Sequence, residues 1–500
     1  MYVKFIRLSS HLIEKNGEGV LGFITNHGYL DNPTFRGMRW HLLRTFDKIW
    51  ILDLHGNSKK KEIAPNGGPD KNVFDIQQGV SIIIGVRKKD SPIGLAKVRH
   101  GDLWGDRESK YATLSKKKIS NGLFSSLLPV APSYSLVPKD LSASGEYLKG
   151  ILLSELMPIH GNGIVTKRDG LNVHYSPEEV LSMTNDIMSL SEAEFRSKYR
   201  LKDDVRDWRY SWARKDVADC GTDIPIQEIG YRLFDNRYIF YSGRARGLVG
   251  WPVQQIMRHY IVGPNVGLLT SKAHHDVQFA HAFVTDKPTE AIHFSATTGS
   301  NAMNFPLYIY PEEDEFDQAK RPNFDPKHLS RIKALAKHPA LGVPNEMQVF
   351  DYVYGVLHSP GYRSHYAELL KQDFPRIPLP SSPDEFWHIS EKGKLLRKLH
   401  LMDVVGTTAS VFGFKGKGDN HVTRYNFDGG KVWINQTQYF EVVTNDSWDF
   451  RIGGYLPAQK WLKDRVGRHL SLEDAKHYQK LLAILAETKK VMDTIELALP

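Results

Sequence analysis

The sequence predicts an α/β protein in which an incomplete doubly wound sheet is followed by an α+β region of antiparallel strands and helices. Two observations support this fold class. Helical and strand patterns alternate through the first 90 residues, which is typical of parallel strands joined by helical crossovers. Beyond residue 223, short aromatic and β-branched runs separated by Gly, Pro and Asn are typical of antiparallel strands.

The elements of the first part follow from the spacing of apolar residues. Residues 2–15 and 36–46 have apolar positions on one side of a helix, and Gly17 and Gly19 are expected to end the first helix. Three apolar runs have the length of buried strands, namely 19–25, 48–54 and 79–86. A complete doubly wound sheet has about six strands, so we expect this sheet to be incomplete.

The second and third of these strands are joined by a long loop, 55–72, which is rich in Gly, Asn, Pro and Lys. Loops of more than about 12 residues are usually functional or disordered. The loop lacks the Gly-x-x-x-x-Gly-Lys-Ser/Thr pattern of a phosphate-binding loop, so nucleotide binding is not expected there.

The rest of the chain divides by composition. Residues after 120 predict a mostly helical connector, and residues after 222 predict the antiparallel region. Further helices are expected at 344–371, 394–402 and 472–497. The sequence therefore predicts three parts: 1–120, 121–222 and 223–500.

Composition excludes several classes of protein. Cys220 is the only cysteine, so neither a disulfide framework nor a cysteine zinc site can form, and a reducing compartment, by default the cytoplasm, is expected. The first residues interrupt apolar positions with charge, which does not fit a signal peptide. The longest aliphatic run, 80–86, is much shorter than the roughly 20 residues that span a bilayer, so no membrane association is expected.

The net charge of +9 is unevenly distributed. Residues 1–120 hold 21 Lys/Arg against 12 Asp/Glu, whereas the remaining 380 residues hold 45 of each. Residues 231–275 are again locally basic, because five arginines and one lysine are opposed only by Asp235. This excess fits a polyanionic partner, although solvated surfaces give the same pattern.

One stretch imitates a catalytic motif. Residues 32–35, "NPTF", differ by one residue from Asn-Pro-Pro-Phe/Tyr, the loop of enzymes that methylate an exocyclic amine on a flipped-out base. That loop must follow a strand of a sheet that already carries a Gly-rich cofactor site, and only 31 residues precede Asn32. We therefore interpret residues 31–33 as a turn that opens the helix starting near Arg36.

A second stretch, "PDEFWHISEKGK" at 383–394, resembles the Pro-Asp…Glu-x-Lys pattern of many DNA nucleases. Nuclease chemistry needs the second acid and the lysine two residues apart, so that a strand projects both toward one metal. Glu391 and Lys394 are three residues apart and would face opposite sides of a strand. The nuclease interpretation is therefore disfavoured.

The chain holds 21 histidines, and His274, His275 and His281 form a group. Metal ligation needs convergent geometry and supporting partners that a sequence does not show, so ordinary surface or core histidines explain the group more simply. Neither Gly-x-Ser-x-Gly nor His-Glu-x-x-His occurs. We therefore expect no metal-binding and no catalytic residues in this chain.

The stretch "YRLFDNRYIFYSGRARGLVGWPVQQIMRHY", 231–260, alternates aromatic residues with arginines. Arginine can contact phosphates or read guanine edges, and aromatic residues can stack on or wedge between bases. A core of aromatic residues with solvated arginines would give the same pattern. The candidates for DNA contact are Arg244, Arg246, Arg258 and Lys272, with Tyr241 and Trp251 as stacking or wedge residues.

Several stretches together resemble one family. The stretches "GVLGFITNHGYLDNPTFRGMRWHLLRTFDKIWILDLHGNSKKKE" and "DKNVFDIQQGVSIIIGVRK" resemble the second half of the adenine-N6 methyltransferase domain of Type ISP and related single-chain restriction-modification enzymes. The stretches "YRLFDNRYIFYS", "VFDYVYGVLHSPGYRSHYAELLKQDFPRIPLP" and "FWHISEKGKLLRKLHLM" resemble the target-recognition, or specificity, domain of the same enzymes. The resemblance extends over most of the chain.

The resemblance implies that this chain recognises a sequence in double-stranded DNA within an adenine-N6 methyltransferase, which in its complete form uses S-adenosylmethionine. The Gly-rich cofactor motif and the Asn-Pro-Pro-Tyr loop of a complete member are missing here, so no cofactor and no catalytic residue is assigned to this chain. We expect a truncated gene product, a separately encoded subunit or a misplaced start codon, with an N-terminal methyltransferase, helicase or nuclease portion as partner. A scaffold subunit that does not touch DNA and an inactive remnant stay open as alternatives.

Overall fold

The computed structural model describes residues 2–58, 62, 64–89, 94–120, 122–131, 133–139, 142–274, 278–294, 301–312, 315–403 and 411–499. Residue His275 of the histidine group and the lysines at 59–61 lie outside the described residues. The chain forms two compact units, Met1–Leu141 and Ser142–Pro500.

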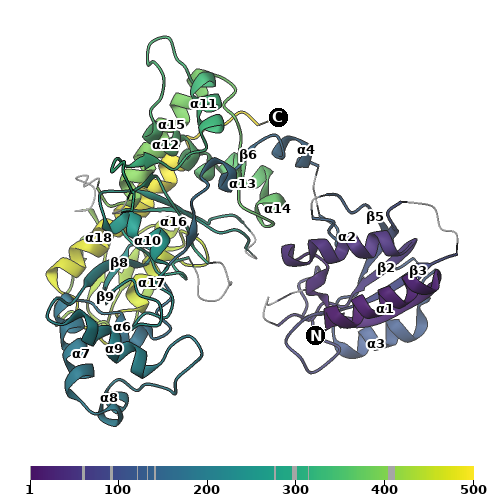
Figure 1. Ribbon diagram of the computed structural model, residues 1–500, viewed down its shortest axis with the longest axis horizontal. Coiled ribbons are helices and arrows are strands. Elements are labelled where there is room, and N and C mark those ends of the chain that lie inside the picture. The colour runs from purple at the N-terminus through teal and green to yellow at the C-terminus, as the bar shows by residue number, and fades with distance from the viewer. Residues whose placement is uncertain are drawn as a thin grey trace. The chain divides into compact units, whose positions relative to one another are not determined.

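The first unit is a sheet with helices on both faces (Figure 1). Its helices are α1 (Tyr2–Asn16), α2 (Arg36–Thr45) and α3 (Arg107–Lys116), with short 3-10 turns at His27–Tyr29 and Pro33–Phe35. Its strands are β1 (Gly19–Asn26), β2 (Lys48–Asp53), β3 (Val80–Arg87), β4 (Lys97–Asp102) and β5 (Ser125–Leu127). The helices and strands expected in the first 90 residues are confirmed.

The sheet of this unit is mixed, so the expectation of a parallel sheet is wrong for most of it. The strand order is β1-β3-β2-β4-β5, and β3 is antiparallel to both β1 and β2. Among the strands that the structure describes in this unit, only β2 and β4 are parallel. The physical reason is that β2 and β3 are joined by a loop and not by a helix, and a loop lets the chain return in the opposite direction.

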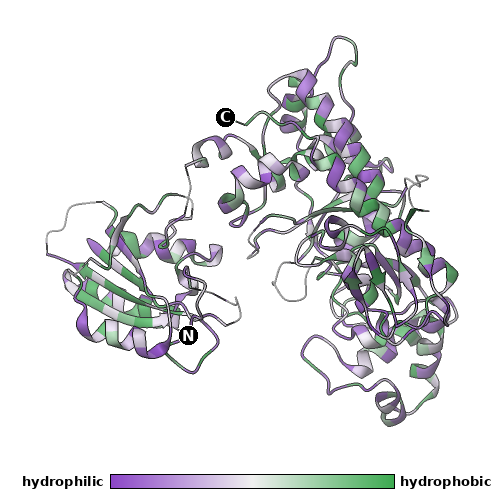
Figure 2. Ribbon diagram, turned by 180° about the vertical axis from the view of Figure 1, so that it is seen from behind, coloured by the Kyte–Doolittle hydropathy of each residue, from purple (hydrophilic) through white to green (hydrophobic). Residues whose placement is uncertain are grey.

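Each face of this sheet has its own core. On one face, α1 and α2 contribute residues such as Ile6 and Leu42 to a cluster with Ile49 and Ile83 of the strands. On the other face, the smaller cluster includes Leu52, and Leu114 of α3 packs against it. The strands are accordingly mostly hydrophobic in Figure 2.

The stretch at 32–35 is a turn, as the sequence analysis predicts. The Asn32 side chain accepts a hydrogen bond from the Thr34 N–H at 2.9 Å and caps the 3-10 turn that leads into α2. The buried Arg39 of α2 donates to the carbonyl oxygens of Asn32 and Tyr29 at 2.7 and 2.9 Å. These contacts hold residues 32–35 as the turn that precedes the first residue of α2.

The second unit is an α+β structure with many short strands. Its helices are α4 (Ser144–Tyr147), α5 (Leu153–Leu156), α6 (Asp169–Asn172), α7 (Pro177–Ser189), α8 (Glu192–Lys198), α9 (Tyr210–Cys220), α10 (Gln254–Ile261), α11 (Pro326–Leu335), α12 (Glu346–His358), α13 (Pro360–His365), α14 (Ala367–Leu370), α15 (Pro383–His400), α16 (Asn445–Trp448), α17 (Pro457–Lys463) and α18 (Leu472–Met492). Its strands are β6 (Ile151–Leu152), β7 (Gly161–Asn162), β8 (Ile226–Arg232), β9 (Asp235–Phe240), β10 (Gly267–Thr270), β11 (Ala282–Thr285), β12 (Met303–Pro306), β13 (Tyr308–Ile309), β14 (Arg321–Pro322), β15 (Arg376–Ile377), β16 (Phe414–Lys415), β17 (Asn426–Asp428), β18 (Lys431–Trp433) and β19 (Tyr439–Phe440).

Every pairing between these named strands is antiparallel, which confirms the expectation for this part of the chain. The larger sheets have the orders β11-β10-β12-β7 and β16-β19-β18-β17, and β8 and β9 form a hairpin. Helices α6, α7, α8 and α9 gather at one end of the unit, while α11, α12 and α15 lie at the other (Figure 1).

Helices α12 and α15 approach each other closely through glycines. A Cβ atom at Gly393 would lie 1.8 Å from the carbonyl oxygen of Asp351, so only glycine fits at this position. Arg397 donates two hydrogen bonds to the Asp351 carboxylate, at 2.6 and 3.0 Å. The nuclease-like stretch lies in α15, where Glu391 and Lys394 pair with each other at 3.4 Å along the helix.

Candidate nucleic-acid interface

Three segments of the second unit meet at the end where α6 to α9 gather. They are the loop 165–168, the start of α9 and the loop 242–252. The two loops are joined by a backbone bridge in which Val165 and Trp251 exchange hydrogen bonds of 2.9 Å. The buried Trp208, just before α9, donates its indole N–H to the carbonyl oxygen of Leu248 at 3.0 Å.

The loop 242–252 is anchored to α9 by one buried carboxylate. Asp216 accepts hydrogen bonds from the Ser242 hydroxyl at 2.7 Å and from the Leu248 N–H at 2.9 Å. Gly247 lies directly against this carboxylate. Because both ends of the segment 242–248 are tied to α9, its middle is held at the surface.

Tyr241 closes the base of the same loop. Its hydroxyl donates to the carbonyl oxygen of Pro252 at 2.8 Å and lies 3.0 Å from Oε1 of Gln254. Burial raises the pKa of the Tyr241 hydroxyl well above its usual range. The side chain is only 6% exposed, so it positions the loop and does not present its ring for base stacking, in contrast to the sequence-based expectation.

The segments present an arginine–tryptophan surface, which we define as Lys167, Arg209, Trp212, Arg244, Arg246 and Trp251. The guanidinium carbons of Arg209 and Arg246 lie 5.0 and 5.7 Å from the ring centroid of Trp212, within the range of cation–π attraction. Both arginines are exposed, and neither forms an ion pair within the described part of the chain. They are therefore available to contact phosphate oxygens or base edges.

A second cation and aromatic pair extends this surface. The ammonium nitrogen of Lys167 lies 4.6 Å from the ring centroid of Trp251, which is 45% exposed. Lys167 and Arg246 both have left-handed backbone conformations, with φ of 64° and 57°. Such conformations cost roughly 1 kcal/mol or more at non-glycine residues and are concentrated at functional sites.

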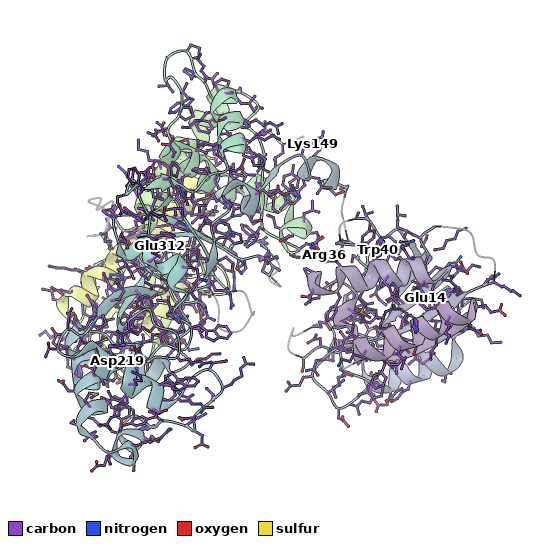
Figure 3. The ribbon with its side chains drawn as sticks, in the orientation of Figure 1. Glu14, Arg36, Trp40, Lys149, Asp219 and Glu312 are labelled. Atoms are coloured by element: carbon purple, nitrogen blue, oxygen red, sulfur yellow. The ribbon has the colours of Figure 1, made fainter. Side chains whose placement is uncertain are left out.

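Arg244 lies on the same loop but is partly neutralised. Its guanidinium nitrogen lies 3.8 Å from Asp216 and 3.6 Å from Asp219 of α9, which is labelled in Figure 3. The side chain is half exposed. A phosphate would have to compete with these carboxylates, so Arg244 is a weaker candidate than Arg246.

The other two predicted cations lie outside this surface. Arg258 of α10 donates to the carbonyl oxygens of Tyr310 and Pro311 at 2.7 and 2.5 Å, so it holds the segment after β13. Lys272 is exposed after β10, with its ammonium nitrogen 5.9 Å from the ring centroid of Phe374. The structure brings Arg244, Arg246 and Trp251 together but not all six candidates.

The local charge excess of residues 231–275 is smaller at the surface than the sequence indicates. Arg232 is buried in an ion pair with Glu290 at 2.7 Å. Arg237 is buried against Asp235, which also pairs with Arg465 at 3.0 Å. A charge count over residues 231–275 includes Asp235 but misses Glu290, because Glu290 lies outside the counted window.

Three residues of the surface were missed by the sequence analysis: Lys167, Arg209 and Trp212. The last two lie in the stretch "RDWRYSWARK", 206–215, which interleaves arginines with aromatic residues as the stretch 231–260 does. Applying the same criterion to the predicted helical connector would have found them. Lys167 carries no such signal, since only the fold brings it to Trp251.

Comparison with known proteins assigns the second unit to a family. Residues 155–494 match the family described as "Type ISP C-terminal specificity domain". This match covers more than half of the chain. The chain belongs to this Type ISP family.

Solved structures of Type ISP and related enzymes share the fold. The DNA-bound Type ISP restriction-modification enzyme LlaBIII matches with a TM-score of 0.71 and 20% identity, over 99% of this chain and 34% of that chain. The DrdV–DNA complex matches with a TM-score of 0.70 and 19% identity, over 100% and 52%. A nuclease-deletion mutant of the Type ISP enzyme LlaGI, in complex with a DNA substrate mimic, matches with a TM-score of 0.68 and 20% identity, over 99% and 40%.

This Type ISP chain thus spans between 34% and 52% of the length of these three structures. No curated protein is significantly similar to it. Among the helices that the structure describes, none is long and apolar enough to cross a bilayer.

Proposed function

We propose that this chain recognises a sequence in double-stranded DNA through the arginine–tryptophan surface of its specificity domain, as part of a restriction-modification adenine-N6 methyltransferase. The observation that carries the proposal is the pairing of two exposed arginines with Trp212 on a domain of the Type ISP specificity family. The structures named above contain DNA or a DNA mimic, which supports DNA as the partner. Cytoplasmic location is part of the same proposal.

The arginine–tryptophan surface suits DNA binding because its cations and its aromatic rings contact different parts of DNA. Arg209 and Arg246 supply the positive charge that attracts phosphates and gives binding its salt dependence. Lys167 adds a partly neutralised charge, because its ammonium nitrogen lies 3.8 Å from the Asp207 carboxylate. Trp212 and Trp251 supply flat apolar area for contact with bases or sugars. Asp216 and Tyr241 hold the loop that carries Arg246, so the cations are positioned before DNA arrives.

Two measurements test the proposal. Binding of the chain to fluorescent duplex DNA is measured by anisotropy at two salt concentrations, and bound duplexes are selected from a randomised pool. We expect affinity to fall as salt rises, and one sequence to be enriched. Arg246→Ala or Arg209→Ala should reduce the salt slope by about one unit if the arginine contacts phosphate, or relax one base position at a cost of about 1–3 kcal/mol if it reads a guanine.

Arg331, an exposed arginine on α11, provides the matched control, and Arg331→Ala should leave both properties unchanged. A folded chain with no measurable DNA affinity would favour the scaffold alternative. An isolated chain that unfolds or aggregates would favour the inactive remnant. Equal losses in the Arg331 and Arg246 variants would remove the arginine–tryptophan surface from the interface.

The methyltransferase part of the proposal concerns the first unit. We infer that its sheet is the second half of a methyltransferase-type sheet and that a separate portion supplies the Gly-rich cofactor motif and the catalytic loop. Strand β1 forms one edge of the sheet, and its Val20 and Ile24 are 67% and 45% exposed, which fits a sheet face that another portion of the protein covers. No residue of this chain is assigned to S-adenosylmethionine, and the division into 1–120, 121–222 and 223–500 stays a prediction.

This part is tested by incubating the chain with labelled S-adenosylmethionine and the selected duplex. We expect no methyl transfer above background, because neither cofactor motif nor catalytic loop is present in the sequence. Transfer that Asn32→Ala abolishes would instead make the turn at 32–35 a catalytic loop.

A further inference from the structure

Three strands of the first unit end at the same edge of the sheet. Strands β1 and β2 are both antiparallel to β3, and β2 is parallel to β4, so β1, β2 and β4 run in one direction. A side chain that could bind a metal ion lies at the carboxyl end of each of these strands. His27 follows β1, Asp53 ends β2 and is followed by His55, and Asp102 ends β4.

His27, Asp53 and His55 converge within this edge. Nδ1 of His27 lies 3.0 Å from Oδ1 of Asp53, and Nδ1 of His55 lies 3.8 Å from Oδ2. One ligand atom from each residue lies within 4.8 Å of the others, and all three residues are more than nine-tenths buried. Two imidazole nitrogens and a carboxylate oxygen are a ligand set that suits Zn²⁺.

The orientation of His55 is fixed by its other contacts. Its Nε2 lies 2.8 Å from Oδ1 of Asp102, and its ring stacks on Trp104 with 3.3 Å between centroids. When Nε2 carries the proton and donates it to Asp102, the lone pair of Nδ1 faces Asp53. The lone pair of His55 Nδ1 and the Asp53 carboxylate then repel each other in a buried site. A cation bound between them would be attracted to both groups.

The ring of His27 is held in a similar way. Its Nε2 lies 3.1 Å from Nδ2 of Asn57, and a Cβ atom at Gly79 would lie only 2.4 Å from its Cε1 atom. A rotation of 180° about the last side-chain bond of Asn57 exchanges the positions of its amide oxygen and nitrogen. With the Asn57 oxygen facing an Nε2–H group, the lone pair of His27 Nδ1 also points toward Asp53.

We propose that His27, Asp53 and His55 bind one transition-metal ion of the Zn²⁺ type, with Asp102 and Asn57 orienting the two imidazoles. Metal-bound histidines usually donate their second N–H group to a carboxylate or carbonyl oxygen. Asp102 offers the carboxylate to His55, and Asn57 offers the amide oxygen to His27 when its amide is turned. Three protein ligands leave the fourth position of a tetrahedral ion open to water or another molecule. The site is independent of the DNA-binding proposal and departs from the sequence-based expectation of no metal ligands.

The decisive experiment uses the natural full chain. The protein is stripped with a chelator, incubated with excess Zn²⁺ or Co²⁺ and freed of unbound metal. We expect one bound ion per chain, a visible absorption typical of tetrahedral Co²⁺, and a higher Tm with Zn²⁺. A folded protein that retains neither metal above the buffer blank would overturn the proposal, whatever the variants do.

Variants then locate the ion. Asp53→Asn and His55→Gln should each abolish the Co²⁺ absorption and the Zn²⁺ effect on Tm, while Asp102→Asn should weaken metal affinity about 10–100-fold. His338, which pairs with Asp384 at 2.9 Å on the surface of the second unit, is the matched control, and His338→Gln should change nothing. Unchanged stoichiometry and spectrum in a folded Asp53→Asn and His55→Gln double variant would place the ion elsewhere and refute this site.

Discussion

Oδ2 of Asp216 lies 2.1 Å from the position that a Cβ atom at Gly247 would occupy. The loop that presents Arg246 therefore depends on the absence of a side chain at this position. Gly247→Ala should push the loop away from α9, break the Leu248 hydrogen bond to Asp216, and lower the free energy of unfolding by about 1–3 kcal/mol.

The same change should weaken DNA binding, because Arg246 and Trp212 would no longer be held together. Anisotropy and thermal melting of Gly247→Ala, measured beside Arg246→Ala, check this expectation. Asp216→Asn keeps the shape of the anchor but loses its charge, so it should show a smaller loss of both properties. A Gly247→Ala protein with unchanged DNA affinity would show that the loop conformation is not needed for binding.

The contact between α12 and α15 gives a prediction about stability alone. A Cβ atom at Gly393 would meet the Asp351 carbonyl oxygen at 1.8 Å, and a backbone atom cannot move aside as a flexible side chain can. Gly393→Ala should therefore cost about 3 kcal/mol or more. Denaturant unfolding measures this cost.

Gly37 in α2 is the matched helical control, because a Cβ atom there meets nothing within 4 Å. Gly37→Ala should raise the stability of the first unit by about 0.5–1 kcal/mol. Equal effects of the two substitutions would mean that α12 and α15 do not pack as closely as the structure has them.

The sequence predicted the elements whose apolar residues are regularly spaced. Strands β2 and β3 are buried on both faces at residues such as Ile51 and Ile83, so their patterns are strong. Strand β4 was missed because Lys97 and Arg99 project from one side of it and give it a polar composition. Strand direction was wrong because β2 and β3 are joined by a loop without a helix, so β3 returns antiparallel to β2. The composition of that loop already indicated that no helical crossover lies between them.

The candidate site was predictable only in part. Arg246 and Trp251 belong to a stretch whose composition marks it, and the structure places both at the surface. Arg232 lies in the same stretch, yet its side chain is buried in an ion pair with Glu290. Glu290 lies 58 residues further along the chain, so the local sequence does not reveal this pairing. Long-range pairing thus separates arginines that hold the fold from arginines that are free to bind.

Buried histidines predict how stability depends on pH. His400 contacts the Tyr354 hydroxyl and the Thr488 hydroxyl, and burial lowers the pKa of its imidazole to about 3. An unfolded histidine titrates near pH 6.5. Between these pH values only the unfolded state takes up the proton. The stability that His400 contributes is therefore fully present above about pH 6.5 and is lost as pH falls.

Protonation of His400 in the unfolded state lowers the free energy of unfolding by about 1.4 kcal/mol per pH unit below pH 6.5, which amounts to about 2 kcal/mol between pH 7 and pH 5. His400→Gln should remove this part of the slope, whereas substitution of the exposed His365 should leave it in place. Denaturant unfolding at several pH values gives both slopes. A His400→Gln protein that loses stability as steeply as the natural chain would contradict the assignment.

The first unit exposes apolar side chains that favour association between molecules. Phe5, Leu8 and Leu12 of α1 are each more than half exposed, as is Val20 of the edge strand β1. Exposed apolar patches and open sheet edges promote aggregation. A chain that begins at Ser142, the start of the second unit, should therefore be more soluble than the whole chain.

The soluble fraction after expression and the elution profile on size exclusion measure this difference. Leu8→Lys in the whole chain is the companion variant, because it charges the apolar side of α1 without removing any element, and it should recover part of the gain. The exposed Leu472 at the start of α18 is a matched control, and Leu472→Lys should have a smaller effect. If the shortened chain is less soluble than the whole chain, then the first unit protects the second and the apolar side of α1 is already covered in the intact protein.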